Sequence, residues 1–176
     1  MIAVSLFFMG QFTLFTYVRP FLEMVGHVDV STLSLILLLM GISGFIGTVL
    51  IGGVLKSSVY PALIVIPVLM AGLAVGLIVL GTWSVACAAI LAAWGLFATS
   101  APVGWWTWLA RTLPKDAEAG GGLMVAVVQL AIMLGATCGG LLFDGIGYQA
   151  TFGASALVLV IAAILAFATM RLAREA

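Results

Sequence analysis

Charged side chains are scarce in this sequence. Of its 176 residues, six are Lys or Arg and six are Asp or Glu, so 7% of the chain is charged and the formal net charge is zero. An ordinary soluble domain carries about 25% charged residues. The zero net charge excludes the basic surface that a nucleic acid polymer would require of its partner.

Catalytic and metal-binding side chains are equally few. There is one histidine, His27, and the two cysteines, Cys87 and Cys138, lie in apolar stretches without a second cysteine or a histidine nearby. This pattern argues against a disulfide framework or a metal site and favours buried thiols. The apolar stretches also hold no paired carboxylates beside a nucleophile and no phosphate-binding loop. We therefore expect neither an enzyme nor a bound cofactor.

A basic leader is missing as well. The first apolar stretch opens at Ile2 with no Lys or Arg before it and no small-residue cleavage site at the right distance, which argues against a secretory signal peptide. The first helix therefore begins abruptly, without a basic segment before it, which predicts a fragment or a split reading frame.

Apolar residues make up most of what is present. Hydrophobic residues account for 65% of the chain, and the mean hydropathy is +1.36. A membrane-spanning helix needs about 20 mostly apolar residues. Six stretches meet this requirement, which predicts an all-α integral membrane protein with six transmembrane helices in a single domain covering residues 1–176. The predicted spans are 2–24, 31–55, 59–80, 84–110, 119–143 and 149–170.

Helix-breaking and capping residues mark expected irregularities. Ser31 is predicted to cap the second helix, and Pro67 is predicted to kink the third. In the fourth helix, Pro102 stands two residues before Gly104, which together remove a backbone hydrogen bond and stiffness. This spacing predicts a bend that can serve as a gating hinge.

Basic residues predict the orientation, because cytoplasmic loops collect Lys and Arg. They follow the second predicted span, the fourth predicted span and the sixth, and an even number of spans places both termini on that side. The sequence therefore predicts cytoplasmic termini. The residues concerned are Lys56, Arg111, Lys115, Arg171 and Arg174.

Ionisable and amide side chains stand out in the first span. Arg19 and Glu23 are four residues apart and face the same side of a helix, with Gln11 two turns below them. Such groups cost several kcal/mol in hydrocarbon unless they pair or line water, so they mark a candidate functional site. Arg19 and Glu23 can form a proton or substrate relay, or an ion pair near the outer surface, since Arg19 lies about 25 Å from Ile2 along the helix.

Two segments carry a likeness to a known family. They are Gly-Gln-Phe-Thr-Leu-Phe-Thr-Tyr-Val-Arg-Pro at residues 10–20 and Pro-Val-Gly-Trp-Trp-Thr-Trp at residues 102–108, and the glycine-rich turn at 139–147 adds to them. With six spans, they resemble the C-terminal half of a major facilitator superfamily transporter. Within the drug:proton antiporter branch the likeness is greatest to bacterial purine ribonucleoside efflux pumps.

This resemblance implies a function that composition alone does not. It implies proton-coupled export of small organic solutes, such as purine ribonucleosides, by alternating access in the bacterial inner membrane. The partner would be a missing N-terminal six-span half or a second copy of the chain, with the substrate site between the halves near the membrane midplane. The alternatives are a non-transporting membrane subunit, an inactive remnant, or an exporter of drugs or other metabolites.

The resemblance also suggests roles for polar and aromatic residues. Gln11 and Gln129 can hydrogen-bond a purine or a ribose, or another helix. Trp94 can stack on a purine ring or pack in the core, and Tyr17 can line the cavity or pack between helices.

Overall fold

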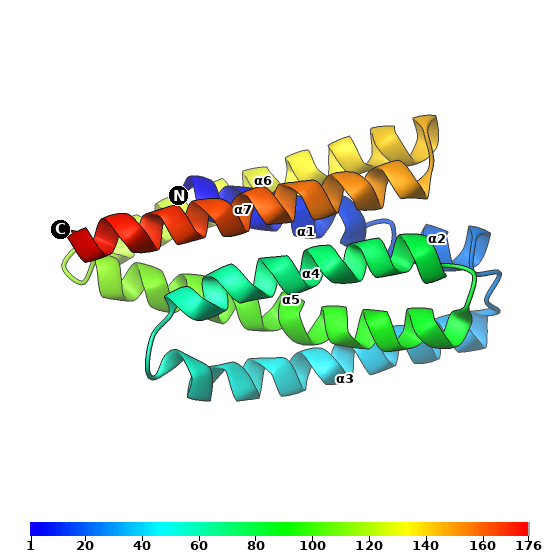
Figure 1. The fold of residues 1–176 in the computed structure, drawn as a ribbon, viewed down its shortest axis with the longest axis horizontal. Coiled ribbons are helices and arrows are strands. Elements are labelled where there is room, and N and C mark those ends of the chain that lie inside the picture. The colour runs from blue at the N-terminus through cyan, green and yellow to red at the C-terminus, as the bar shows by residue number, and fades with distance from the viewer. Residues whose placement is uncertain (176) are drawn as a thin grey trace.

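The computed structural model describes residues 1–175, and the described chain is built from seven α-helices (Figure 1). Their bounds are α1 Ile2–Phe15, α2 Val18–Met24, α3 Val30–Leu55, α4 Tyr60–Leu80, α5 Ser84–Thr112, α6 Ala117–Gly145 and α7 Tyr148–Glu175. Taken together, α1 and α2 form one span, so the described residues hold six segments long and apolar enough to cross a membrane. The predicted all-α fold with six transmembrane helices is confirmed.

The helices lie side by side in one elongated bundle. Figure 1 shows both termini at the same end, together with the turn between α3 and α4 and the loop between α5 and α6. The helices α5, α6 and α7 run further than the apolar stretches expected from the sequence. For example, α7 continues to Glu175, where the sequence predicted a span ending at residue 170. The helix continues beyond the apolar segment because its backbone hydrogen bonds form within the helix itself.

Packing follows two groups of helices. In one group, α3 packs on α5 and α4 packs on both α5 and α7; in the other, α1 packs between α6 and α7. Large side chains that are almost fully buried fill the space between them, including Phe7, Phe21, Trp94 and Phe152. The outer surface is rich in exposed aliphatic side chains, as expected of a bundle whose surroundings are lipid or further helices.

Glycine lets two helix pairs approach closely. A methyl group at Gly47 of α3 would overlap the carbonyl oxygen of Leu96 of α5, and one at Gly135 of α6 would overlap the carbonyl oxygen of Met9 of α1. Small residues at helix interfaces serve this purpose in membranes, where packing rather than water exclusion drives association.

The first span is not one continuous helix, contrary to the sequence prediction. It is interrupted at Thr16 and Tyr17, and Tyr17 has φ −105° and ψ 8°. Pro20 supplies the reason, since it has no N–H to donate to the carbonyl of Thr16 and its ring crowds that carbonyl. The helix therefore stops and restarts one turn before the proline.

One further expectation differs from the structure. The cap of α3 is Asp29 rather than Ser31, because the Asp29 carboxylate accepts hydrogen bonds from the Ser31 backbone N–H and the Thr32 hydroxyl. α4 and α5 each continue as one helix through Pro67 and Pro102, so the kink and the bend predicted there would lie within unbroken helices. Neighbouring helices and hydroxyl groups can support a helix past a proline in a membrane.

Candidate functional site

Gln11 is the buried amide of the first span. Its side chain is 7% exposed, and its Oε1 atom has no hydrogen-bond partner. Gln11 lies one turn after Phe7 on the same face of α1, and the Phe7 ring lies 6.3 Å from the ring of Trp105 on α5. An unpaired buried acceptor costs about 1–3 kcal/mol. The interior of the bundle therefore holds an acceptor on α1 that a ligand or a water molecule could satisfy.

Trp94 carries the second unpaired polar atom of this interior. Its side chain is completely buried, and its Nε1 makes no hydrogen bond. Trp94 and Trp105 are eleven residues apart on α5, which places them on the same helix face. Because α1 and α5 run in opposite directions (Figure 1), Trp94 lies about 10 Å further along the bundle than Gln11. The two unpaired atoms thus mark different depths of one interior.

Tyr17 joins the break in the first span to α6. Its hydroxyl donates to the carbonyl oxygen of Ala136 at 2.8 Å, and its ring stacks on Phe143 with 5.3 Å between centroids. A methyl group at Gly139 would lie 3.0 Å from the Tyr17 ring. Tyr17 is therefore engaged in helix packing, and a solute would reach its hydroxyl only if the bond to α6 opened.

Gln129 lies on the outside of the bundle. It is exposed on α6, on the side of that helix turned away from its packing against α1. Of the six spans, α6 is the least covered, with 17% of its apolar window buried, and α3 follows with 28%. Gln129 therefore faces whatever surrounds α6, rather than the interior that contains Gln11 and Trp94.

Arg19 and Glu23 form an ion pair on α2. The Nε atom of Arg19 lies 2.8 Å from Oε1 of Glu23, and their side chains are 71% and 44% exposed. In Figure 1, α2 lies at the end of the bundle opposite the termini. This location agrees with the outer-surface alternative, and an exposed pair of this kind contributes only about 0–1 kcal/mol to stability.

The proposed hinge residues lie where α5 meets its neighbours. Pro102 is half-buried, whereas Gly104 is buried, and a methyl group at Gly104 would lie 3.2 Å from Leu63 of α4. One turn earlier, the Thr99 hydroxyl donates to the carbonyl oxygen of Gly44 on α3 at 2.6 Å. Movement at Pro102 would therefore change the contacts of α5 with both α3 and α4.

Hydroxyl groups on α7 were missed by the sequence analysis. Ser155 and Thr151 are completely buried. The Ser155 Oγ donates to the carbonyl oxygen of Gly10 on α1 at 2.6 Å, and the Thr151 hydroxyl donates to that of Gly139 on α6 at 3.1 Å. Their four-residue spacing on an apolar helix was the available signal. The Ser155 bond holds α7 against the backbone of α1 beside Gln11, and the Thr151 bond holds α7 against α6.

The eight predicted site residues do not converge on one site within this chain. Gln11 and Trp94 share the interior, Tyr17 packs on α6, Gln129 faces outward, and the Arg19 ion pair lies at one end. Within residues 1–175, no group of three or more His, Cys, Asp or Glu side chains could hold a metal ion. What remains is a multi-pass helical membrane bundle with unpaired polar atoms inside, consistent with one half of a major facilitator superfamily transporter.

Known proteins match nearly the whole chain. Transcription regulatory protein OpdE of Pseudomonas aeruginosa is 61% identical over 171 residues, which are 97% of this chain and 42% of that protein. Purine ribonucleoside efflux pump NepI of Salmonella typhimurium and that of Salmonella typhi are each 41% identical over 172 residues, which are 98% of this chain and 43% of each pump. The resemblance to purine ribonucleoside efflux pumps is confirmed. No family model and no solved structure matches.

The match covers only part of each relative. The chain spans less than half the length of the curated relatives it matches. Because the match covers 97–98% of the chain, the likeness concerns the whole bundle rather than one motif.

Proposed function

We propose that this chain is part of a membrane exporter for small uncharged organic solutes, with purine ribonucleosides as the substrate class and proton exchange as the driving reaction. The observation that carries the proposal is the 41% identity to a purine ribonucleoside efflux pump over 98% of the chain. Two buried polar atoms without partners, on α1 and α5, support a role for the interior beyond packing.

The proposed mechanism is alternating access. The six-span bundle would rock against a second six-span body, either an N-terminal half or a second copy of this chain. The least covered span, α6, is suited to meet that body. Gln129 on α6 would then border the space between the two bodies.

The proposed residue roles follow from their positions. Gln11 would accept a hydrogen bond from a purine amine or a ribose hydroxyl, and Gln129 would contact the solute from the second side. Trp94 and Tyr17 are covered in this conformation, so each would contact the solute only after neighbouring helices move. Pro102 and Gly104 would form the gating hinge, and protonation of Glu23 would release Arg19 during proton exchange.

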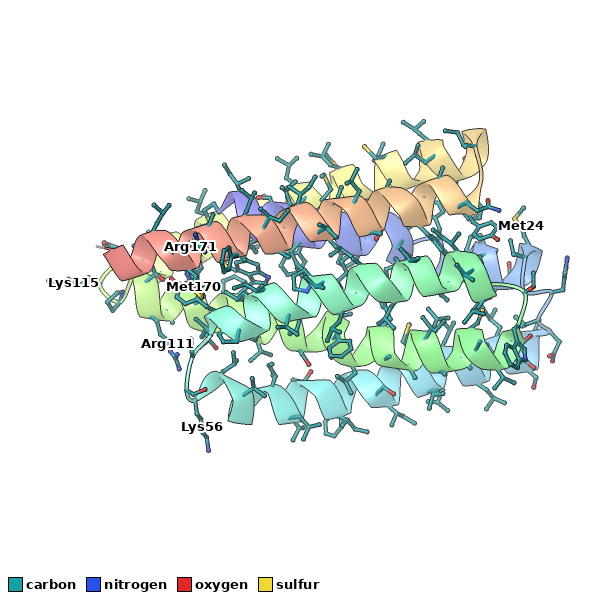
Figure 2. All side chains as sticks on the ribbon, in the orientation of Figure 1. Met24, Lys56, Arg111, Lys115, Met170 and Arg171 are labelled. Carbon is teal, nitrogen blue, oxygen red and sulfur yellow. The ribbon has the colours of Figure 1, made fainter. Side chains whose placement is uncertain are left out.

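The proposed location is the bacterial inner membrane with both termini in the cytoplasm. Figure 2 shows Lys56, Arg111, Lys115 and Arg171 at the end of the bundle that also holds the termini. The positive-inside rule assigns that end to the cytoplasm.

A chimeric exporter tests the proposal. Residues 1–176 would replace the matching 172-residue segment of a NepI pump, and export of radiolabelled inosine from cells would be measured with and without a protonophore. We expect export that stops when the proton gradient is abolished. The same chimera with Gln11→Met, which keeps the side-chain volume and removes the amide, is expected to export inosine with a higher KM.

A second candidate function rests on the 61% identity to a protein named as a transcription regulatory protein. Under this alternative the chain belongs to a membrane protein that does not transport. A chimera that inserts stably in the membrane at normal abundance and exports no inosine would favour this alternative over export.

A further inference from the structure

A groove on the outside of the bundle lies between α3 and α4, with α5 as its floor. Its volume is ≈ 320 Å³. It exists because α3 and α4 each pack on α5 but have little direct contact with each other. Gly47 approaches the backbone of α5 closely, so α3 lies tight against the floor of the groove.

The walls of this α3–α4 groove are hydrocarbon. Val54, Ala62, Val65 and Leu96 are among the lining residues. The only side-chain hydroxyl is that of Ser100, and it is already engaged, since Ser100 Oγ donates to the carbonyl oxygen of Leu96 at 2.6 Å. The groove therefore offers no free polar group to a polar solute. An apolar occupant suits these walls, because it gains dispersion contacts that an empty groove lacks.

The groove opens toward the membrane. Val54 and Val65 on its rim are exposed aliphatic side chains on helices that span the bilayer. From residue 61 to residue 69 of α4 it extends about 12 Å along the bundle. A lipid acyl chain is the apolar material available next to such a surface, and it can lie along a groove of this length.

One end of the groove carries positive charge. The lining residues Val54 and Pro61 flank the turn that contains Lys56. Arg111 lies beside this turn, because its Nη2 donates to the carbonyl oxygen of Leu55 at 2.8 Å, and Figure 2 shows both basic side chains at this end. Within the described chain Lys56 makes no ion pair. The N-terminal end of α4 adds the positive end of its helix dipole at the same place.

No negative charge opposes these groups on the same helices. From Val30 to Leu113 the sequence contains no Asp or Glu, so α3, α4 and α5 carry no carboxylate side chain. A basic cluster beside a membrane-facing apolar groove is the arrangement that binds an anionic phospholipid head group.

We infer that the α3–α4 groove is a binding site for an anionic phospholipid of the adjacent leaflet. One acyl chain lies in the groove, and the phosphate is bound by Lys56 and Arg111. The bilayer itself is the source of the ligand. This inference requires that the bundle be in a membrane and does not depend on the transport proposal.

Native mass spectrometry tests the site. The protein of residues 1–176 would be released from bilayer discs containing equal amounts of phosphatidylglycerol and phosphatidylcholine with identical acyl chains. We expect phosphatidylglycerol to be retained preferentially. Lys56→Gln is expected to lower its affinity about fivefold, since each basic residue near an anionic surface contributes on that scale, whereas Lys56→Arg keeps it.

A second variant tests where the acyl chain lies. Val65→Phe fills the groove from its exposed rim and is expected to reduce retention of phosphatidylglycerol. Two matched controls should leave retention unchanged: Lys115→Gln removes a basic residue at the same end but off the groove, and Val79→Phe makes the same change elsewhere on α4, where the side chain is also exposed. Circular dichroism and gel filtration would verify that each variant is folded.

Three results would overturn the inference. Equal retention of the two lipids would remove the preference for negative charge, and unchanged retention in Lys56→Gln would remove the proposed phosphate contact. Loss in Lys56→Gln without loss in Val65→Phe would exclude the groove as the place of the acyl chain.

Discussion

At the scale of single residues, the unpaired polar atoms inside the bundle separate function from packing. Helix packing explains Tyr17, whose hydroxyl and ring are both engaged with α6. It does not explain Gln11, whose Oε1 is buried without a donor. A residue kept for stability alone would not leave that atom unpaired, because the unpaired acceptor opposes folding.

Gln11→Met is therefore predicted to leave stability unchanged or to raise it, while weakening solute binding. Loss of one hydrogen bond to an uncharged solute corresponds to about a three- to tenfold increase in the KM for inosine export. The measurement is export kinetics of the chimeric exporter, paired with thermal unfolding in detergent. An unchanged KM with lower stability would assign Gln11 to packing.

Ser155→Ala is predicted to destabilise the bundle by about 0.5–1.5 kcal/mol, because it removes the hydrogen bond from α7 to the Gly10 carbonyl. Thermal unfolding in detergent measures the change. Thr169→Ala is the matched control, since the Thr169 hydroxyl bonds only to the Leu165 carbonyl of its own helix. Equal melting temperatures for the two variants would contradict the proposed role of Ser155.

At the scale of helices, the ends and breaks depend on a few polar groups and prolines. The Thr32 hydroxyl, which donates to the Asp29 carboxylate at the start of α3, lowers the pKa of that carboxyl. A carboxyl with a lowered pKa stabilises the fold at pH values above its unfolded pKa. That contribution is lost as the pH falls through the folded pKa.

Asp29→Asn is accordingly predicted to lower the melting temperature at neutral pH, and to lower it less at an acidic pH below the unfolded pKa of the carboxyl. Asparagine still caps a helix, but it lacks the charge that strengthens these hydrogen bonds. Melting temperatures of both proteins at the two pH values measure this difference. Asp144→Asn serves as the control, and a wild-type advantage that is undiminished at the acidic pH would refute the prediction.

Pro20→Ala is predicted to join α1 and α2 into one helix. Alanine restores an N–H that can bond to the Thr16 carbonyl, so amide hydrogen exchange at residues 17–20 should slow. Pro61→Ala is the matched control, because Pro61 lies in the first turn of α4, where a missing N–H costs nothing. Unchanged exchange around Tyr17 in Pro20→Ala would show that another contact imposes the break.

At the scale of the whole molecule, charge and exposure describe how the bundle sits among its neighbours. Basic residues collect at the end with the termini, and the least covered spans are α3 and α6. The basic residues orient the bundle in the membrane. The poorly covered spans indicate where lipid or further helices would pack. Both concern surroundings rather than the interior.

Reporter fusions test the orientation. Green fluorescent protein fused after residue 176 should fluoresce, and alkaline phosphatase fused after Gly26 should be active, because these sites are predicted to lie on opposite sides of the membrane. The reversed pair of results, with an inactive phosphatase at Gly26 and no fluorescence at the C-terminus, would reverse the bundle.

The sequence by itself determined the six spans and the likeness to efflux pumps. Both follow from properties that act locally: an apolar run of about 20 residues must span or be buried, and short motifs such as residues 10–20 and 102–108 are read along the chain. The break at Tyr17 was also within reach of the sequence, because Pro20 is its local cause.

The tertiary structure alone decided which polar groups are satisfied. Ser155, Tyr17 and Arg111 each donate to a backbone carbonyl more than 50 residues away in the chain, whereas Gln11 finds no partner. The groove between α3 and α4 arises in the same way, because both helices pack on α5 but have little direct contact with each other. Such features depend on how helices meet, and helical periodicity records only which residues share a face.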